Sequence, residues 1–134
     1  MKQFFLTLFF LLSFVLNAQK TINYSNVAQE LLENIIHKKG HNQQLEILAE
    51  STLDDLVSEL KTDPQKIAFW VNIYNAFIQI SLTENPSEYE NRGVFFGKKR
   101  IKIAGEILSF DTIEHGIIRK SRIKISLGYL RKWF

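Results

Sequence analysis

The sequence predicts an α+β domain that is mainly helical and carries one small β-hairpin. Apolar residues recur at helical spacing in several segments, most clearly over residues 67–82. Residues 99–109 instead alternate polar and apolar side chains around a turn at residues 104–106, which is typical of a hairpin. The whole chain has 134 residues, which is enough for one domain.

The N-terminus has the composition of a targeting leader. Lys2 supplies a positive charge, residues 4–16 are an apolar block, and Ala18 offers a small residue for cleavage. The block has the length of a signal-peptide core and is short for a bilayer span. We therefore expect a signal peptide at residues 1–18 and an exported protein, periplasmic or secreted, with a single domain at residues 19–134. A leader that is not cleaved would leave the protein anchored in the membrane.

The next segments predict two amphipathic helices. Residues 27–39 have a periodic apolar face, and Ser25 or Asn26 can cap the first free N–H groups. Residues 51–54, Ser-Thr-Leu-Asp, resemble a capping box and predict a second helix of about three turns. The short apolar patch at residues 45–49 has no periodicity that assigns it to a helix or a strand.

The longest apolar run after the leader predicts a helix at the centre of the domain. Asp63 can cap this helix and Pro64 suits its first turn. Apolar residues cover most faces of residues 67–82, so we expect Trp70 to lie in the interior.

Three amides form one polar stripe on this helix: Asn72, Asn75 and Gln79. An unpaired buried amide costs about 1–3 kcal/mol, so each should find a partner. Buried amides most often bond neighbouring backbone, and that is the role we expect here. The alternative is that the stripe orients a binding site.

The segments after the central helix predict a polar loop at residues 84–93, a brief apolar stretch at residues 94–97 and then the hairpin, with Ile101 and Ile103 directed inward. The basic run at residues 98–100 is typical of a solvated turn.

A fourth helix follows, and it carries the most interesting titratable residue. Asp111-Thr112-Ile113-Glu114 reads as a capping box, with Asp111 as the cap and Glu114 as its partner. His115 lies one turn after Asp111 and one turn before Arg119, on one face of the helix. An Asp–His pair can act as a base and its orienter, although a histidine on a short helix is more often a structural hydrogen bonder.

The sequence predicts neither a metal site nor a cofactor. His37 and His41 have the spacing of two metal ligands on a helix, but Gly40 lies between them and no carboxylate pattern completes a site. The chain contains no cysteine, which excludes a disulfide, a thiolate nucleophile or a cysteine-ligated metal within it. No phosphate-binding loop or nucleophile elbow is present.

Charge is segregated along the chain. Residues 19–96 carry six Lys/Arg and eleven Asp/Glu, whereas residues 97–134 carry ten Lys/Arg and three Asp/Glu. The two parts could attract one another, or the basic C-terminal part could present a face to a protein or other anionic partner. We expect no nucleic-acid binding, because the leader indicates export and no binding motif is present.

Two stretches resemble the signatures of a known family. Ala-Phe-Trp-Val-Asn-Ile-Tyr-Asn-Ala at residues 68–76 is similar to the first signature of the family called domain of unknown function 547, and Phe-Asp-x-Ile-Glu-His at residues 110–115, followed by an apolar pair and Arg119, resembles the second. The resemblance covers about residues 53–119. It implies site residues at the matching positions: Asn72, Tyr74, Asn75 and Arg119 for binding, and Glu114 and His115 for catalysis.

The resemblance also implies a longer domain. In that family the domain continues to a Ser-Cys-Pro motif, so this chain is expected to be the N-terminal part of such a domain. A suspected relationship of the family to papain-like or transglutaminase-like cysteine enzymes implies a hydrolase or acyl-transferase in which His115 would serve a thiolate. Because this chain has no cysteine, we expect it to act as a binding or interaction module, with no activity assigned.

Overall fold

A computed structural model describes residues 21–119, so the leader and the basic residues 120–134 lie outside the described residues. The elements, in order, are helices α1 (Tyr24–Ile36), α2 (Asn42–Glu50), α3 (Leu53–Glu59) and α4 (Asp63–Glu84), the 3-10 helix η1 (Pro86–Glu90), α5 (Arg92–Gly97), strands β1 (Ile101–Ile103) and β2 (Glu106–Leu108), and the π-helical turn η2 (Thr112–Ile118). The expected α+β class, mainly helical with one hairpin, is confirmed. No helix within residues 21–119 combines the length and apolar character needed to cross a bilayer.

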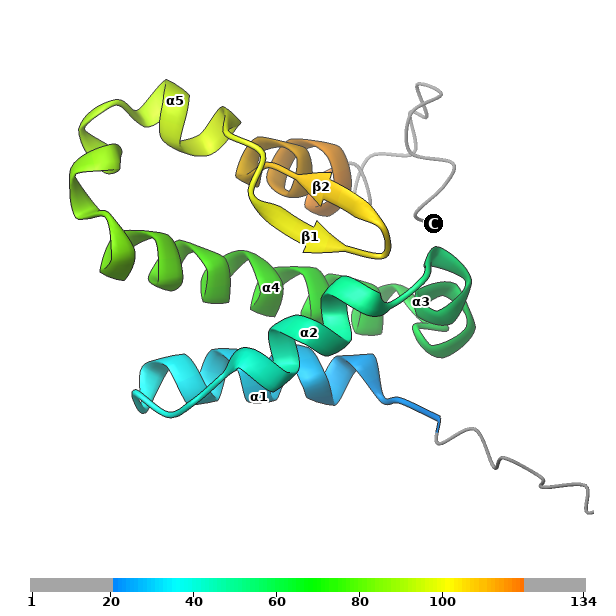
Figure 1. Cartoon of the computed structure of the whole chain (residues 1–134). Coiled ribbons are helices and arrows are strands. Elements are labelled where there is room, and N and C mark those ends of the chain that lie inside the picture. The colour runs from blue at the N-terminus through cyan, green and yellow to red at the C-terminus, as the bar shows by residue number, and fades with distance from the viewer. Residues whose placement is uncertain (1–20, 120–134) are drawn as a thin grey trace, which may run out of the picture.

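Helix α4 runs through the middle of the structure, with other elements packed on both sides. Figure 1 shows α1 along one side of α4 and η2 along the other, and α2 packs against both α1 and β1. Trp70 is 2% exposed, which confirms its expected place in the interior. Its ring meets that of Phe69 edge to face, with centroids 5.0 Å apart.

The core is one cluster to which most elements contribute. Side chains that are fully buried come from α1, α2, α4, α5, the hairpin and η2. The largest of these are Trp70, Phe69, Phe95, Phe110, Leu31, Leu48, Ile73, Ile101, Ile103, Ile113 and Ile117. Burial of these large aliphatic and aromatic side chains makes the main contribution to the stability of the fold.

The expected cap of α1 is wrong. The helix begins at Tyr24, and Asn23 is its cap, accepting a 2.9 Å hydrogen bond from the Asn26 N–H. Neither Ser25 nor Asn26 caps the helix. The start lies earlier than the apolar period suggests because the Tyr24 side chain is itself buried against the core.

The caps of α3 and α4 also differ from the expected ones by one residue. Thr52, rather than Ser51, forms a complete capping box with Asp55 at the start of α3. Thr62, rather than Asp63, does the same with Gln65 at the start of α4. Ser51 is instead buried, where its hydroxyl donates to the Leu48 carbonyl.

Two other segments are more helical than the sequence pattern indicates. The unassigned residues 45–49 lie within α2, whose Leu48 is fully buried. The expected polar loop at residues 84–93 contains η1 and the start of α5. Aromatic contacts hold this segment in place. The Tyr89 ring meets the Phe95 ring edge to face with centroids 5.2 Å apart, and the Phe95 ring stacks on the Phe110 ring with centroids 5.3 Å apart.

The hairpin follows the prediction closely. β1 and β2 pair antiparallel with Ile101 opposite Leu108, and the expected burial of Ile101 and Ile103 is confirmed. The turn has two residues, Ala104 and Gly105, at φ values of 52° and 75°. Positive φ at both positions matches the twist of the two strands, which favours this turn type in hairpins.

Candidate functional site

A hydrogen-bonded chain of three predicted site residues joins α4 to η2. The Tyr74 hydroxyl on α4 donates a 3.1 Å hydrogen bond to one carboxylate oxygen of Glu114 on η2. The other Glu114 oxygen accepts a 2.7 Å hydrogen bond from the Arg119 guanidinium. The two signature stretches therefore meet in space, with Glu114 between a neutral and a charged donor.

The π-helical turn of η2 makes the pairing of Glu114 with Arg119 feasible. Side chains five apart lie on different faces of an α-helix, where neighbours are three or four apart. In η2 the Arg119 N–H instead bonds the Glu114 carbonyl at 2.9 Å, which is the five-residue spacing of a π-helix. Wider turns bring residues five apart onto one side, and the ion pair forms there.

The predicted capping box at residues 111–114 is wrong. Asp111 already has helical backbone angles and its side chain makes no capping bond. The cap is Ser109, whose hydroxyl accepts from the Thr112 N–H at 3.2 Å and whose carbonyl accepts from the Ile113 N–H. The helical turn starts earlier because Phe110 is fully buried in the core. As a result, neither Asp111 nor Glu114 is used as a cap.

Burial and the neighbouring carboxylate keep Tyr74 protonated. Burial of the phenol, followed by its hydrogen bond to Glu114, raises the pKa of Tyr74 to about 12. The ring also contacts Phe110 edge to face, with centroids 5.6 Å apart. Tyr74 is thus a fixed hydrogen-bond donor at neutral pH rather than an acid that exchanges its proton.

His115 and Asp111 face each other on the exposed side of η2. The His115 Nε2 atom lies 4.0 Å from an Asp111 carboxylate oxygen, and the two side chains are 54% and 50% exposed. This distance is too long for a hydrogen bond but suits an ion pair when the imidazole is protonated. His115 could act as a base and Asp111 could orient its ring. The two residues lie one helical turn apart and are both in contact with solvent.

The amide stripe does not bind backbone within the described residues. Asn72 is half-buried, whereas Asn75 and Gln79 are exposed. None of the three side chains has a hydrogen bond to another residue of the 21–119 range, so the expected backbone role is wrong there. No polar contact joins His115 to Asn72 or Asn75 in this range either. The polar contact that joins α4 to η2 is the hydrogen bond between Tyr74 and Glu114.

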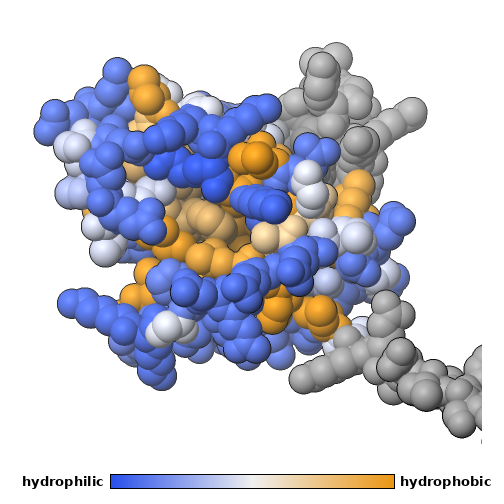
Figure 2. All heavy atoms as spheres, viewed as in Figure 1, coloured by the Kyte–Doolittle hydropathy of each residue, from blue (hydrophilic) through white to orange (hydrophobic). Residues whose placement is uncertain are grey.

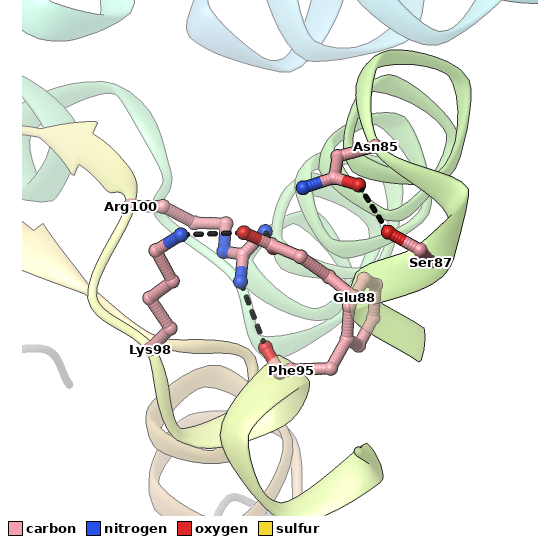
Figure 3. A network of polar contacts seen from close by, with 6 residues as sticks. All are labelled: Asn85, Ser87, Glu88, Phe95, Lys98 and Arg100. Atoms are coloured by element: carbon pink, nitrogen blue, oxygen red, sulfur yellow. Dashed lines mark hydrogen bonds and ion pairs between the residues drawn. The ribbon is translucent and has the colours of Figure 1, made fainter. Parts of the chain in front are cut away.

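A second polar network lies at the carboxyl end of α4, and no sequence pattern predicts it. Glu88 accepts a 2.6 Å hydrogen bond from Lys98 and a 2.7 Å hydrogen bond from Arg100 (Figure 3). These bonds lower the pKa of the Glu88 carboxyl. The Arg100 guanidinium also bonds the Phe95 carbonyl at 3.3 Å and lies over the Phe95 ring at 5.1 Å.

This network corrects the expectation of a solvated basic turn at residues 98–100. Lys98 and Arg100 reach Glu88 over ten and twelve residues of sequence, a separation at which no local pattern pairs side chains. Of the three basic residues, two are therefore paired with one carboxylate.

The two histidines with the spacing of metal ligands, His37 and His41, lie at the ends of different helices. His37 ends α1, and His41 precedes α2 with its ring 3.3 Å from the Lys39 carbonyl. Within residues 21–119, no cluster of three or more His, Cys, Asp or Glu side chains is arranged to hold a metal ion.

Comparison with known proteins identifies a family for the chain. The family model described as protein of unknown function DUF547 matches residues 57–132, a range that contains α4, the hairpin and η2. A search of curated proteins and a search of solved structures each find no match. The matched range includes every candidate site residue at the junction of α4 and η2, and it covers more than half of the chain. The chain belongs to the DUF547 family.

Proposed function

We propose that the protein is an exported binding module that recognises an acidic segment of a partner protein. The recognition site would be the junction cluster, which we define as Tyr74, Asp111, Glu114, His115 and Arg119. The observation that carries the proposal is the chain from Tyr74 through Glu114 to Arg119, which fixes charged groups at a half-exposed surface.

Arg119 is the group in the cluster best suited to bind a carboxylate. Its side chain is 62% exposed, and one of its nitrogen atoms is bonded to Glu114. A guanidinium carries five N–H donors in a planar fork, so others remain for a second carboxylate. His115 lies on the same short turn and adds positive charge when protonated. The basic composition of residues 97–134 would strengthen attraction to an acidic partner.

Titration of the full chain with a short oligoglutamate peptide tests this site. We expect NMR shift changes centred on Arg119 and His115, weakened by Arg119→Gln and by added salt. Arg92→Gln is the matched control, since Arg92 is exposed and its guanidinium packs on the Tyr89 ring instead of pairing with Glu114. Equal loss of binding in both variants would refute a specific site.

Export has a separate test. N-terminal sequencing of the mature protein should find Gln19 as its first residue if the leader is removed after Ala18. A protein that retains Lys2 and fractionates with membranes would support the alternative of an anchored domain.

The second candidate is a hydrolase or acyl-transferase of the cysteine-enzyme type, with a nucleophile encoded beyond Phe134. The observation that favours it is the exposed His115 beside Asp111, at 4.0 Å, because a catalytic imidazole needs a carboxylate or amide to orient it. Sequencing the gene downstream of the Phe134 codon should then reveal a Ser-Cys-Pro segment in some frame. In the longer product, His115→Asn should shift the pH profile of thiol alkylation, whereas an unshifted profile would exclude His115 as the base.

A further inference from the structure

A pocket of about 350 Å³ lies at the carboxyl end of α4, and it shares no residue with the junction cluster. It is lined by the end of α4, by Leu45 of α2, by Asn85 and Glu88, and by Lys98 and Arg100. In the view of Figure 2, apolar residues lie at the bottom of a hollow between hydrophilic rims. The volume falls at the lower end of the range for small-molecule sites.

One face of α4 forms a wall of this pocket, and it changes from apolar to polar along its length. Phe77, Ile80, Ser81 and Glu84 follow the spacing of a single helix face. Phe77 and Ile80, with Leu45 opposite, offer apolar contact. Ser81 and Glu84 lie in the last turn, where free carbonyl groups and the helix dipole favour a positive charge.

Ser81 is a polar group of the pocket wall that is available to a ligand. It is 5% exposed and lines the pocket, and its hydroxyl has no hydrogen bond to any residue of the described range. The hydroxyl is not among the fully buried atoms of that range that lack a partner, so it stays within reach of solvent. A ligand with a hydrogen-bonding group can therefore bond it.

The opposite side of the pocket presents hydrogen-bond donors. Lys98 uses one contact for Glu88 and has two further N–H groups. Asn85 has its oxygen fixed by a 2.8 Å bond from the Ser87 hydroxyl, which leaves the amide NH₂ available. Figure 3 shows this amide turned toward the ion pairs. The Nε atom of Arg100 is also buried and has no partner in the described range.

The charges of the pocket balance. Glu84 and Glu88 contribute two negative charges, and Lys98 and Arg100 contribute two positive ones. A ligand of net charge would disturb this balance, whereas a zwitterion finds a partner at each end. Glu84 has no ion pair with another residue of the 21–119 range, so its carboxylate can receive an ammonium group.

We propose that this pocket binds an apolar α-amino acid in its zwitterionic form. The ammonium group is held by Glu84 and the Ser81 hydroxyl, and the carboxylate by Lys98 and the Asn85 amide. The side chain packs on Leu45, Phe77 and Ile80. This inference is independent of the proposed protein-binding site.

Calorimetric titration of the full chain with three probes tests the proposal: L-leucine, N-acetyl-L-leucine and L-leucinamide. Leucine should bind, and each capped derivative should bind at least about tenfold more weakly, since each lacks one of the two charges. Equal affinity for leucine and either derivative, or no binding at about 10 mM leucine, would overturn the proposal.

Two variants locate the binding. Ser81→Ala should weaken leucine binding while leaving the unfolding midpoint unchanged, because the hydroxyl that it removes bonds no other residue of the described range. Lys98→Met should weaken binding at least about tenfold, whereas Lys99→Met, an exposed neighbour outside the pocket, should not. Leucine binding that both Ser81→Ala and Lys98→Met leave intact would place the ligand elsewhere and refute the pocket.

Discussion

The Tyr74 hydroxyl donates a hydrogen bond to the Glu114 carboxylate across forty residues of sequence. This bond joins the two stretches whose motifs resemble the family signatures. It explains why a tyrosine is useful on an otherwise apolar helix: its ring packs on Phe110 while its hydroxyl reaches the next element. Glu114, held also by Arg119, is thereby fixed in place.

Replacing Tyr74 by Phe should lower the free energy of unfolding by about 1–2 kcal/mol, because a hydrogen bond to a partly buried carboxylate is lost. Urea denaturation measures the change. Tyr89→Phe is the control, since it keeps the ring contacts of Tyr89. In a double-mutant cycle with Glu114→Gln, strict additivity would show that the bond contributes nothing.

Stability should fall at high pH because of the same residue. The pKa of Tyr74 is raised from 10.0 to about 12 in the folded protein, so the folded state holds this proton more tightly than the unfolded state. The resulting stabilisation is complete below pH 10 and is lost as the pH rises toward 12. Denaturation midpoints measured across this range should fall less steeply in Tyr74→Phe. An identical slope in both proteins would contradict the shift.

Ser109 and Asp111 provide a direct test of which residue caps η2. Ser109→Ala should cost about 0.5–2 kcal/mol, the usual cost of losing a cap. Asp111→Ala should change stability by less than about 0.5 kcal/mol, because that side chain is exposed and caps nothing. Thermal unfolding of both variants gives the comparison. A larger loss of stability in Asp111→Ala than in Ser109→Ala would support Asp111 as the cap, as the sequence predicts.

Two substitutions in the hairpin turn should change the stability of the protein in opposite directions. Ala104 has a φ of 52°, which strains an alanine, and Ala104→Asn should stabilise the protein by up to about 1 kcal/mol. Gly105 has a φ of 75°, and Gly105→Ala should destabilise it by about 1–2 kcal/mol, although open space surrounds the added methyl group. Equilibrium denaturation of both variants tests the turn. Effects of the same sign would show that crowding, rather than backbone conformation, decides the outcome.

Local sequence patterns were sufficient for the central helix and the hairpin. Helix α4 has a long apolar period and a Thr-x-x-Gln capping box at its start, and β1 alternates buried and exposed residues. The helix starts were less predictable because adjacent residues compete for the cap. Thr52 rather than Ser51 caps α3, because the Ser51 side chain is buried and its hydroxyl is bonded to the Leu48 carbonyl. Helix α5 depends on aromatic contacts between distant residues, which no local period records.

For the candidate site, the sequence identified residues but not their partners. Tyr74, Glu114, His115 and Arg119 were found through motif positions and helical spacing. The π-helical turn was not foreseen, and it redirects Arg119 from the face of His115 to Glu114. The pocket beside Ser81 had no sequence signal, because its walls come from α2, α4 and the segment after α5.

Residues close together in the chain were enough to predict the family, the central apolar helix with Trp70 inside, and the hairpin. The contact of Tyr74 with Glu114, the pairing of Glu88 with Lys98 and Arg100, and the place of Ser81 in a pocket became visible only in the folded chain. These pairings depend on how whole elements pack, and packing is governed by burial summed over many distant residues rather than by any local pattern.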